Sequence, residues 1–395
     1  MNIVCARDIL NKAITPALSA VANKNTVQAL DGLLITANKN DGTLVICGYD
    51  LEKGVKVTAP GGVAQINKSG GVIINAVKFS SIIRNLPDGD VSISVDSNLS
   101  VNIECGDNEF TLHGLDGKVF PLMPELKGDK NFKLSKKVLK NMISATLFSV
   151  ANNESRPALN GALFEIKNNQ LNVVGTDRYR LSLRRSFEGL VSSEELDINF
   201  IIPGKSLAEL LKLIDDENEP VEIELTRKHV IFSFDNIIYF SRLIESEYLD
   251  YRRVIKIDPK TSVIINTQKF LESVERSALL AEKTNLQKIK LILNKEVNIE
   301  NKDEMGILQV TSTSSIGKMC AKCDIEIYGD DLTIAFNQRY LSDALKAIKD
   351  EKILMKFESV LKSLVILPYD NNTEVDVNNA KFVYLVVPVR MLDEN

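Results

Sequence analysis

Short apolar runs that end in polar turns recur along the chain at regular distances. Leu30–Ile35 and Leu159–Phe164 are alike, and each follows a helical stretch. After a polar turn comes another strand-like run, Leu44–Gly48 in the first case and Leu171–Gly175 in the second, at an offset of 129 residues. Repetition at a fixed offset is typical of a fold built from copies of one unit.

A second pair of segments repeats in the same order. Val72–Lys78 and Phe200–Lys205, which are 128 residues apart, each pass from a short apolar strand directly into an amphipathic helix. The same transition recurs at Leu332–Asn337, ahead of a helix that extends to Lys349. A helix at Gln268–Lys283 then fits as the first helix of a third unit.

These repeats predict an α+β fold of three units of about 130 residues, each made of two strand–helix–strand–strand–strand halves. We place the units at residues 1–127, 128–257 and 258–395. Each half would form a sheet of its own, so that six sheets are backed by helices on one side. The expected further strands are Val91–Val95, Val221–Leu225, Val230–Phe234 and Leu364–Leu367, with turns at Asp88-Gly89, Asn168-Asn169 and Asp370-Asn371-Asn372.

Positive charge is concentrated in the segments expected to be helical. The net charge of the whole chain is −5, which alone argues against nucleic-acid binding. The helical windows nevertheless carry a net charge of +10, and the remaining residues carry −15. These windows are residues 6–24, 76–86, 135–148, 204–214, 268–283 and 337–349. The predicted helices are thus basic overall, and the remaining strands and loops are acidic overall.

The basic side chains of these helices are expected to point away from the sheets. At about 100° per residue, Leu207, Leu210, Leu211 and Ile214 share one face, and Lys205 and Lys212 lie on the opposite one. If the helices lined the inside of a cylinder, these residues would bind the phosphates of DNA without reading its bases. Such contacts would allow the protein to slide along the DNA. An ordinary solvated helix face is the alternative. The candidate DNA-contacting residues are Lys12, Lys78, Arg84, Lys136, Lys137, Lys140, Lys205, Lys212, Arg339, Lys346 and Lys349.

The composition is that of a globular cytoplasmic protein. Hydrophobic residues make up 44% and charged residues 26% of the chain. No apolar run approaches the roughly 18 residues of a membrane span, and the charges at Arg7 and Asp8 do not fit a signal peptide. We therefore expect no membrane segment.

The cysteines and histidines do not form a recognisable catalytic or metal-binding pattern. Cys320 and Cys323 have the spacing of half a zinc site, but the other cysteines are single, and residues three apart in a strand face opposite sides. His113 and His229 lie in strand-like runs without a nearby nucleophile. Cys5 stands at a helix start, where the pKa of a thiol can fall, but it has no positioned partner.

Acidic pairs are the remaining candidates for chemistry. They are Asp88-Gly89-Asp90, Glu194-Glu195 and Asp215-Asp216-Glu217, and each fits a solvated turn. We predict no catalytic residue, no metal and no cofactor. A metal-dependent hydrolase on repeated sheets and a purely structural ring remain as alternatives.

Four short motifs lie in the second and third predicted units. They are Val174–Leu181 (VGTDRYRL), Ser241–Val254 (SRLI and DYRRV), Phe336–Leu345 (FNQRYLSDAL) and Tyr384–Met391 (YLVVPVRM). In this order they resemble the segments ATDGHRL, SKL with PDYRRV, FN..YL.DAL and YVVMPMRL of the bacterial beta sliding clamp, the processivity subunit of DNA polymerase III. The resemblance covers essentially the whole chain.

The resemblance implies a non-enzymatic head-to-tail homodimer, in which two three-domain chains close a six-domain ring around double-stranded DNA. It implies that a clamp loader opens the ring. It also implies that the DNA polymerase III alpha subunit and other partners dock through a short peptide in an apolar cleft. Lys24 and Arg156 become further candidates for DNA contact.

The resemblance also transfers a peptide site to this chain, with some departures. The site comprises Leu159, Thr176, Arg178, Tyr179, Arg180, Leu181, Leu249, Arg253, Val254, Ser363, Val387, Pro388, Val389, Arg390 and Met391. Arg178-Tyr179 replaces the Gly-His pair of the family, and Leu249 replaces a proline. Val387 and Val389 replace methionines, which makes the site stiffer. Leu392–Asn395 extend beyond the usual end of the family.

Overall fold

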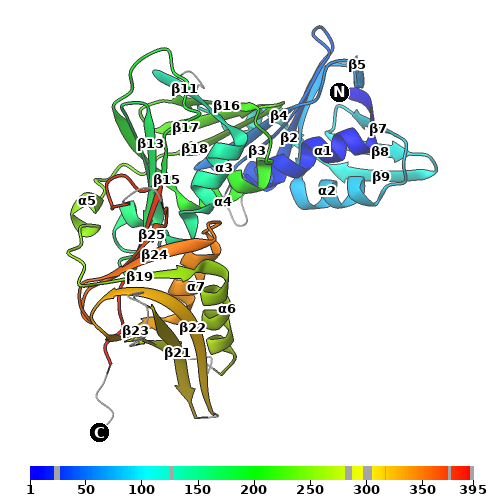
Figure 1. Cartoon of the computed structure of the whole chain (residues 1–395). Helices are drawn as coiled ribbons and strands as arrows, with labels where there is room; N and C mark the ends of the chain where they lie inside the picture. The colour runs from blue at the N-terminus through cyan, green and yellow to red at the C-terminus, as the bar shows by residue number, and fades with distance from the viewer. Residues whose placement is uncertain are drawn as a thin grey trace. The chain divides into compact units, whose positions relative to one another are not determined.

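The element order confirms the predicted repeat. The computed structural model describes residues 1–21, 27–124, 128–280, 287–296, 305–315, 317–371 and 375–391. Six times in succession, a strand leads into a helix and three strands follow it (Figure 1).

The first four halves lie before residue 243. Half one has β1 (Asn2–Ala6), α1 (Arg7–Leu18), β2 (Gly32–Asn38), β3 (Thr43–Tyr49) and β4 (Lys53–Thr58). Half two has β6 (Gly70–Asn75), α2 (Ala76–Asn85), β7 (Asp90–Val95), β8 (Ser100–Cys105) and β9 (Asn108–His113), flanked by β5 (Ala64–Lys68) and β10 (Leu115–Asp116). Half three has β11 (Lys130–Ser135), α3 (Lys136–Ser144), β12 (Gly161–Lys167), β13 (Gln170–Thr176) and β14 (Arg180–Ser186). Half four has β15 (Ile198–Pro203), α4 (Gly204–Leu213), β16 (Pro220–Leu225), β17 (His229–Phe234) and β18 (Ile237–Arg242).

The last two halves follow a short helix, α5 (Tyr251–Val254), which the sequence patterns did not predict. Half five has β19 (Thr261–Asn266), α6 (Thr267–Ser277), β20 (Lys288–Lys295), β21 (Met305–Ser314) and β22 (Gly317–Gly329). Half six has β23 (Leu332–Asn337), α7 (Gln338–Lys346), β24 (Lys352–Phe357), β25 (Leu364–Pro368) and β26 (Phe382–Val386).

Asparagine caps explain why some strands pass directly into a helix. Asn75, Asn266 and Asn337 each end a strand, and each side chain accepts a hydrogen bond from a backbone amide of the helix that follows. The first amides of a helix have no partner within the helix, so an asparagine oxygen at this position stabilises the helix start. The helices α2, α6 and α7 therefore begin within one residue of the predicted positions.

Local details differ from the prediction at a few positions. The residues Leu30-Asp31 and Leu159-Asn160 belong to 3-10 turns, η1 (Gln28–Asp31) and η4 (Pro157–Asn160), and the strands begin only at the glycines that follow. The predicted helix from residue 268 ends as α6 at Ser277 and a 3-10 turn to Leu280, and its expected end at Lys283 lies outside the described residues. The helix predicted to reach Lys349 ends at Lys346.

The predicted turn at Asn168-Asn169 is confirmed. It joins β12 to β13, whose ends pair through Lys167 and Gln170. Both asparagines have positive φ angles, 50° and 59°, as a two-residue turn between antiparallel strands requires. Of the turn expected at Asp370-Asn371-Asn372, the last residue lies outside the described part of the chain.

The pairing of the strands was not foreseen. Each half does not form its own sheet, because its first strand pairs with the other half of the same unit: β1 pairs with β7, and β6 pairs with β2. The exchange recurs for β11 with β16 and β15 with β12, and for β19 with β24 and β23 with β20. All of these pairs are antiparallel.

The resulting four-stranded groups are joined edge to edge. Pairing of β4 with β18, of β14 with β26 and of β19 with β22 leaves three sheets in the described residues, of five, nine and twelve strands. The prediction of six separate sheets is therefore wrong. A free strand edge exposes unpaired backbone groups, and joining the groups removes several such edges.

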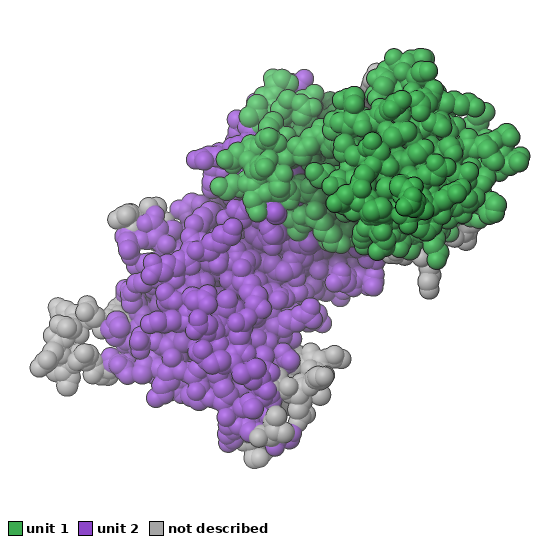
Figure 2. Space-filling view, turned by 90° about the vertical axis from the view of Figure 1, so that its right-hand side faces the viewer, with its two compact units in different colours: residues 1–137, 191–193, 208–243 green, residues 138–190, 194–207, 244–395 purple. Residues whose placement is uncertain are grey.

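The chain divides into two compact units (Figure 2). Unit 1 comprises residues 1–137, 191–193 and 208–243 and holds the five-stranded and nine-stranded sheets. Unit 2 comprises residues 138–190, 194–207 and 244–395 and holds the twelve-stranded sheet. A core of buried aliphatic and aromatic residues in unit 2 includes Phe270, Phe336 and Leu341, which lie on α6, β23 and α7. Ala344 and Leu345 of α7 are buried as well, so this helix packs its apolar face into the core.

Candidate functional site

Most of the predicted DNA-contacting side chains of the helices are exposed. The exposed members are Lys12, Lys78, Arg84, Lys137, Lys205, Lys212, Arg339, Lys346 and Lys349, together with Arg156 of the segment before η4. Lys140 is half-buried, and Lys24 lies outside the described residues. Three of these exposed cations have acidic neighbours among the described residues: Lys212 lies 3.1 Å from Glu209, Lys346 lies 2.9 Å from Glu275, and Arg339 lies 3.8 Å from Asp343.

Lys136 is the exception, and its predicted outward direction is wrong. Its side chain is only 2% exposed. The Nζ atom donates hydrogen bonds to Asp235 at 2.8 Å, Glu219 at 3.0 Å and Asp215 at 3.3 Å. Lys136 is the first residue of α3 and follows directly on β11. The ends of neighbouring strands and the α4–β16 loop lie close together at this position. Helical periodicity does not show such contacts, so it did not reveal the burial of Lys136.

These carboxylates decide the protonation state of Lys136. Burial acts to lower the pKa of its ammonium group, but the hydrogen bonds to Asp235, Glu219 and Asp215 outweigh burial and raise the pKa above its usual value. Lys136 is therefore a charged internal partner of an acidic cluster and not a surface cation.

The predicted peptide site is centred on the end of β14, where Arg180 is 8% exposed. Its Nε atom donates to Asp177 at 2.9 Å, and its Nη1 atom donates to Asp343 at 2.6 Å. The guanidinium also lies over the ring of Tyr340 at 4.6 Å and near that of Phe148 at 5.6 Å. Because both charge and ring contacts are used within the protein, Arg180 positions the site and offers little free surface to a peptide.

The turn before Arg180 holds the two residues that depart most from the family motif. Arg178 has a φ angle of 76°, in the region that favours glycine, and the family has glycine here. Its Nη2 atom donates to Glu154 at 2.7 Å. Tyr179 is 58% exposed and stacks on Tyr340 with ring centroids 6.2 Å apart. A charged and an aromatic side chain thus form the outer surface of this turn.

Three strand ends bring separate parts of the site together. Val386 pairs with Arg180 on one side and with Leu364 on the other. One residue further along, the backbone amide of Val387 donates to the carbonyl of Tyr179 at 2.8 Å. By the same register Ser363 lies beside Val387. Residues from β14, β25 and β26 are therefore neighbours at this edge.

An apolar cluster lies next to these strand ends. Leu181 is buried within it, and Leu249 and Val387 pack against it while partly exposed. Val254 at the end of α5 is 45% exposed, and Arg253 is exposed with its Nε atom 3.0 Å from Asp250. Four further members of the predicted site differ in exposure: Leu159 and Thr176 are buried, and Pro388 and Val389 are half-buried.

The last two members of the predicted peptide site lie apart from this group. The carbonyl of Arg390 accepts a hydrogen bond from Nζ of Lys288 at 3.1 Å. Met391 lines a hollow over β20, β21 and β22 that contains no other residue of the predicted peptide site. Val389 leads the chain there, since its amide donates to the carbonyl of Ala335 on β23 at 2.8 Å.

Some residues that hold the site together were not predicted. Asp177, Asp343 and Tyr340 all contact Arg180, although the first lies in the VGTDRYRL motif and the others in FNQRYLSDAL. The motifs therefore pointed to these residues. Only the pairing of β14 with the far end of the chain explains why the residues of the two motifs contact one another.

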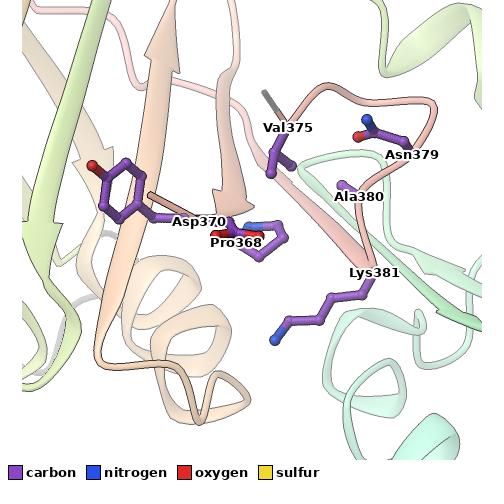
Figure 3. A pocket seen from close by; sticks show the side chains of 7 residues that line it. Pro368, Asp370, Val375, Asn379, Ala380 and Lys381 are labelled. Atoms are coloured by element: carbon purple, nitrogen blue, oxygen red, sulfur yellow. The ribbon is translucent and has the colours of Figure 1, made fainter. Parts of the chain in front are cut away.

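A second hollow, of about 390 Å³, lies at the β25–β26 connection (Figure 3). Pro368, Val375 and Lys381 are among its lining residues, and none of the predicted site residues lines it. The connection is held in place by Arg185, whose guanidinium donates to the carbonyls of Ala380 at 2.6 Å and Val377 at 2.9 Å. Burial lowers the pKa of Arg185.

The other predicted chemical groups are also placed by the structure. Cys320 is exposed and Cys323 is buried on strand β22, as expected for residues three apart, and all five cysteines are free. The pKa of Cys5 does not fall: burial, with a contribution from Asp90, raises it to about 11. In the described residues no three His, Cys, Asp or Glu side chains are grouped as a metal site would require. Nor is any described helix both long and apolar enough to span a bilayer.

Comparison with known proteins accounts for this arrangement. Family models of the N-terminal, central and C-terminal domains of the DNA polymerase III beta subunit match residues 1–124, 133–250 and 252–389. This chain belongs to the DNA polymerase III beta subunit family. It has the three-domain α+β fold of that family, while the boundaries at residues 127 and 257 stay a prediction.

Relatives in this family match the chain from end to end. The beta sliding clamps of Bacillus subtilis and Staphylococcus aureus are each 31% identical to it, covering 99% of this chain and 100% and 99% of theirs. The crystal structure of the Bacillus subtilis sliding clamp superposes with a TM-score of 0.90, at 31% identity, covering 99% of this chain and 100% of that one. A Pseudomonas aeruginosa clamp bound to griselimycin superposes with a TM-score of 0.87, at 25% identity, covering 99% and 100%.

Proposed function

We propose that this protein is a sliding clamp, which encircles double-stranded DNA without sequence specificity and tethers the replicative polymerase for processive synthesis. The full-length match to beta sliding clamps carries the proposal. The protein would act by binding and would catalyse no reaction. Two chains would associate head to tail as a ring of six domains with two equivalent interfaces.

The exposed cations of the helices would provide the DNA-binding surface. Nine of the predicted helix side chains are exposed, and none of the three asparagine-capped helices has an acidic residue in its first turn. Lysine and arginine contacts to phosphates give affinity but carry no sequence information, so such a surface can hold a duplex and still move along it. Lys136 is excluded from this surface because its charge is used internally.

Reversing two exposed helix charges is expected to weaken the salt dependence of DNA binding. Lys137→Glu combined with Lys205→Glu should lower the slope of log K against log salt by about 2, roughly one for each lost phosphate contact. Lys39→Glu combined with Lys260→Glu is a matched control, since these lysines are also exposed but lie outside the helices. Fluorescence anisotropy with duplex DNA over a salt series measures the slopes. Equal slopes for the two pairs would refute the helix surface.

The peptide site would capture a short linear segment of the polymerase III alpha subunit, the clamp loader or other partners. Its apolar floor is the cluster that contains Leu181, Leu249 and Val387, and its outer edge carries Arg178 and Tyr179. Partly exposed apolar side chains beside a few fixed polar groups suit the binding of a peptide. Arg180 would keep the β14 turn and α7 in place.

Val254→Glu is expected to weaken peptide binding by roughly 10–30-fold, because it places a charge on an apolar contact surface. The probe is a fluorescent peptide copied from the clamp-binding segment of the alpha subunit, and anisotropy measures the affinity. Val119→Glu is the control, since Val119 is 58% exposed and lies outside the predicted peptide site. Arg180→Ala is unsuitable, because it would leave Asp177 and Asp343 unpaired. Equal affinity for both variants would place the peptide elsewhere.

A further inference from the structure

A hollow of about 460 Å³ on the β20–β21–β22 sheet concentrates positive charge where the sequence predicted acidic strands. Lys288 and Lys290 of β20 and Lys318 of β22 line it, and we call it the lysine hollow. The described residues that line it also include Thr313 and Met391, and none of them is acidic. Three ammonium groups around one hollow favour a ligand that brings carboxylates or other anions.

The lysine hollow is built on regular strand pairing. Lys290 pairs with Thr311, Thr311 with Cys320, and Thr313 with Lys318, so these side chains share one face of the sheet. Leu308 and Val310, which alternate with these residues along β21, are fully buried on the opposite face. The lysines are thus carried by a packed sheet, so little ordering is needed when a ligand binds.

The end of the described chain runs into this hollow. The amide of Val389 donates to Ala335 on the edge strand β23, and the carbonyl of Arg390 accepts from Lys288 at 3.1 Å. Met391 then forms part of the wall. The sequence continues with Leu392, Asp393, Glu394 and Asn395, whose positions the structure does not describe. At about 3.3–3.6 Å per residue, both acidic residues are within about 11 Å of Met391 along the chain.

We propose that the lysine hollow binds the carboxylates of Asp393 and Glu394 from the same chain. Charge complementarity and the short tether favour this occupant, because a tethered group is present at a high effective concentration. The contact fastens the segment from Val387 to Met391, part of which lies at the predicted peptide site. The inference does not rest on the proposed function, since neither DNA nor a partner is involved in it.

Zero-length carbodiimide cross-linking of the full-length protein tests the proposal. The reagent joins a carboxylate to a lysine amine only when they are in contact, and mass spectrometry identifies the joined peptides. We expect links from Asp393 and Glu394 to Lys288, Lys290 and Lys318, with yields about tenfold above links to Lys260 and Lys349, two exposed lysines elsewhere. The variant with Asp393→Asn and Glu394→Gln should show none of these links.

Two conditions sharpen the test. In about 1 M NaCl, where the Debye length is about 3 Å, the yields should fall several-fold. In a mixture of isotopically light and heavy protein, links should join peptides of one label only. Links spread over all exposed lysines would overturn the proposal, and links between light and heavy chains would overturn it in favour of a second copy as the occupant.

Cys320 gives an independent measurement. It lines the lysine hollow and is exposed, whereas the other four cysteines are buried. A chain that ends at Met391 should react with N-ethylmaleimide about threefold faster or more at Cys320 than the full chain, because nothing then occupies the hollow. The double variant with Asp393→Asn and Glu394→Gln should behave like the shortened chain. Equal labelling rates for all three proteins would overturn the proposal.

Discussion

Lys136→Met is expected to lower the free energy of unfolding by about 2–3 kcal/mol. The substitution keeps a long apolar stem but removes the charge that Asp235, Glu219 and Asp215 share. Breaking a fully buried pair costs about 3–5 kcal/mol. The loss here is smaller because the carboxylate side chains are 43–62% exposed and water screens their repulsion.

The pH dependence of this loss has a definite sign. The folded-state pKa of Lys136 is raised above the ordinary value of 10.5, so its contribution is fully present below that value and is lost as the pH rises through the folded-state pKa. In the variant, the neighbouring carboxylates have lost this counter-charge and repel one another. The difference in the free energy of unfolding between wild type and variant should therefore persist through the neutral range and shrink as the pH rises above 10.5.

Lys137→Met is the matched control for this substitution. Lys137 is the next residue of the same helix and is exposed, so its replacement should change stability by no more than about 0.5 kcal/mol. Urea denaturation followed by circular dichroism measures both variants. If the two variants unfolded at the same urea concentration, the buried charge cluster would not contribute to stability.

The protein is also expected to remain on closed circular DNA under conditions that remove it from linear DNA. Phosphate contacts weaken steeply with salt, so at about 0.5 M NaCl they should no longer hold the protein on a duplex. A closed ring around a circular duplex cannot leave by sliding, whereas it leaves a linear duplex at the ends. After loading by the clamp loader, we expect retention on circles to exceed retention on linear DNA by about tenfold or more.

Gel filtration of loaded complexes measures this difference, and cutting the circle with a restriction enzyme provides the control on the same sample. A solution mass of two chains together with a scattering curve for a hollow particle would establish the ring in the absence of DNA. Equal retention before and after cutting would rule out topological linkage and with it the proposed function.

The sequence alone determined the elements of this protein and their order. Short apolar runs predicted strands such as Leu332–Asn337, and the amphipathic pattern after each run predicted the helix that follows it. These features depend on neighbours in the chain, because backbone periodicity and capping are local. The amphipathic stripe of α7 was predictable for the same reason, and so was the exposure of Arg339 and Lys346 opposite to it.

The candidate site was predictable only as a set of motifs. VGTDRYRL and YLVVPVRM pointed to Arg180 and Val387, but nothing in either segment says that Val387 donates to Tyr179 or that Arg180 bonds to Asp343, 163 residues away. Met391 belongs to the predicted peptide site, and the structure places it in the wall of the lysine hollow. Position along a motif does not reveal where a chain turns after its last strand.

Tertiary structure decided which strands pair and which charges are buried. Each half carries apolar alternation that any antiparallel partner can satisfy, so the sequence could not show that β1 pairs with β7 or that β14 pairs with β26. Lys136 has the residue type and helix position of a surface cation, yet carboxylates from the α4–β16 loop and from Asp235 surround it. Both outcomes depend on contacts between residues far apart in the chain, whereas periodicity and capping record only near neighbours.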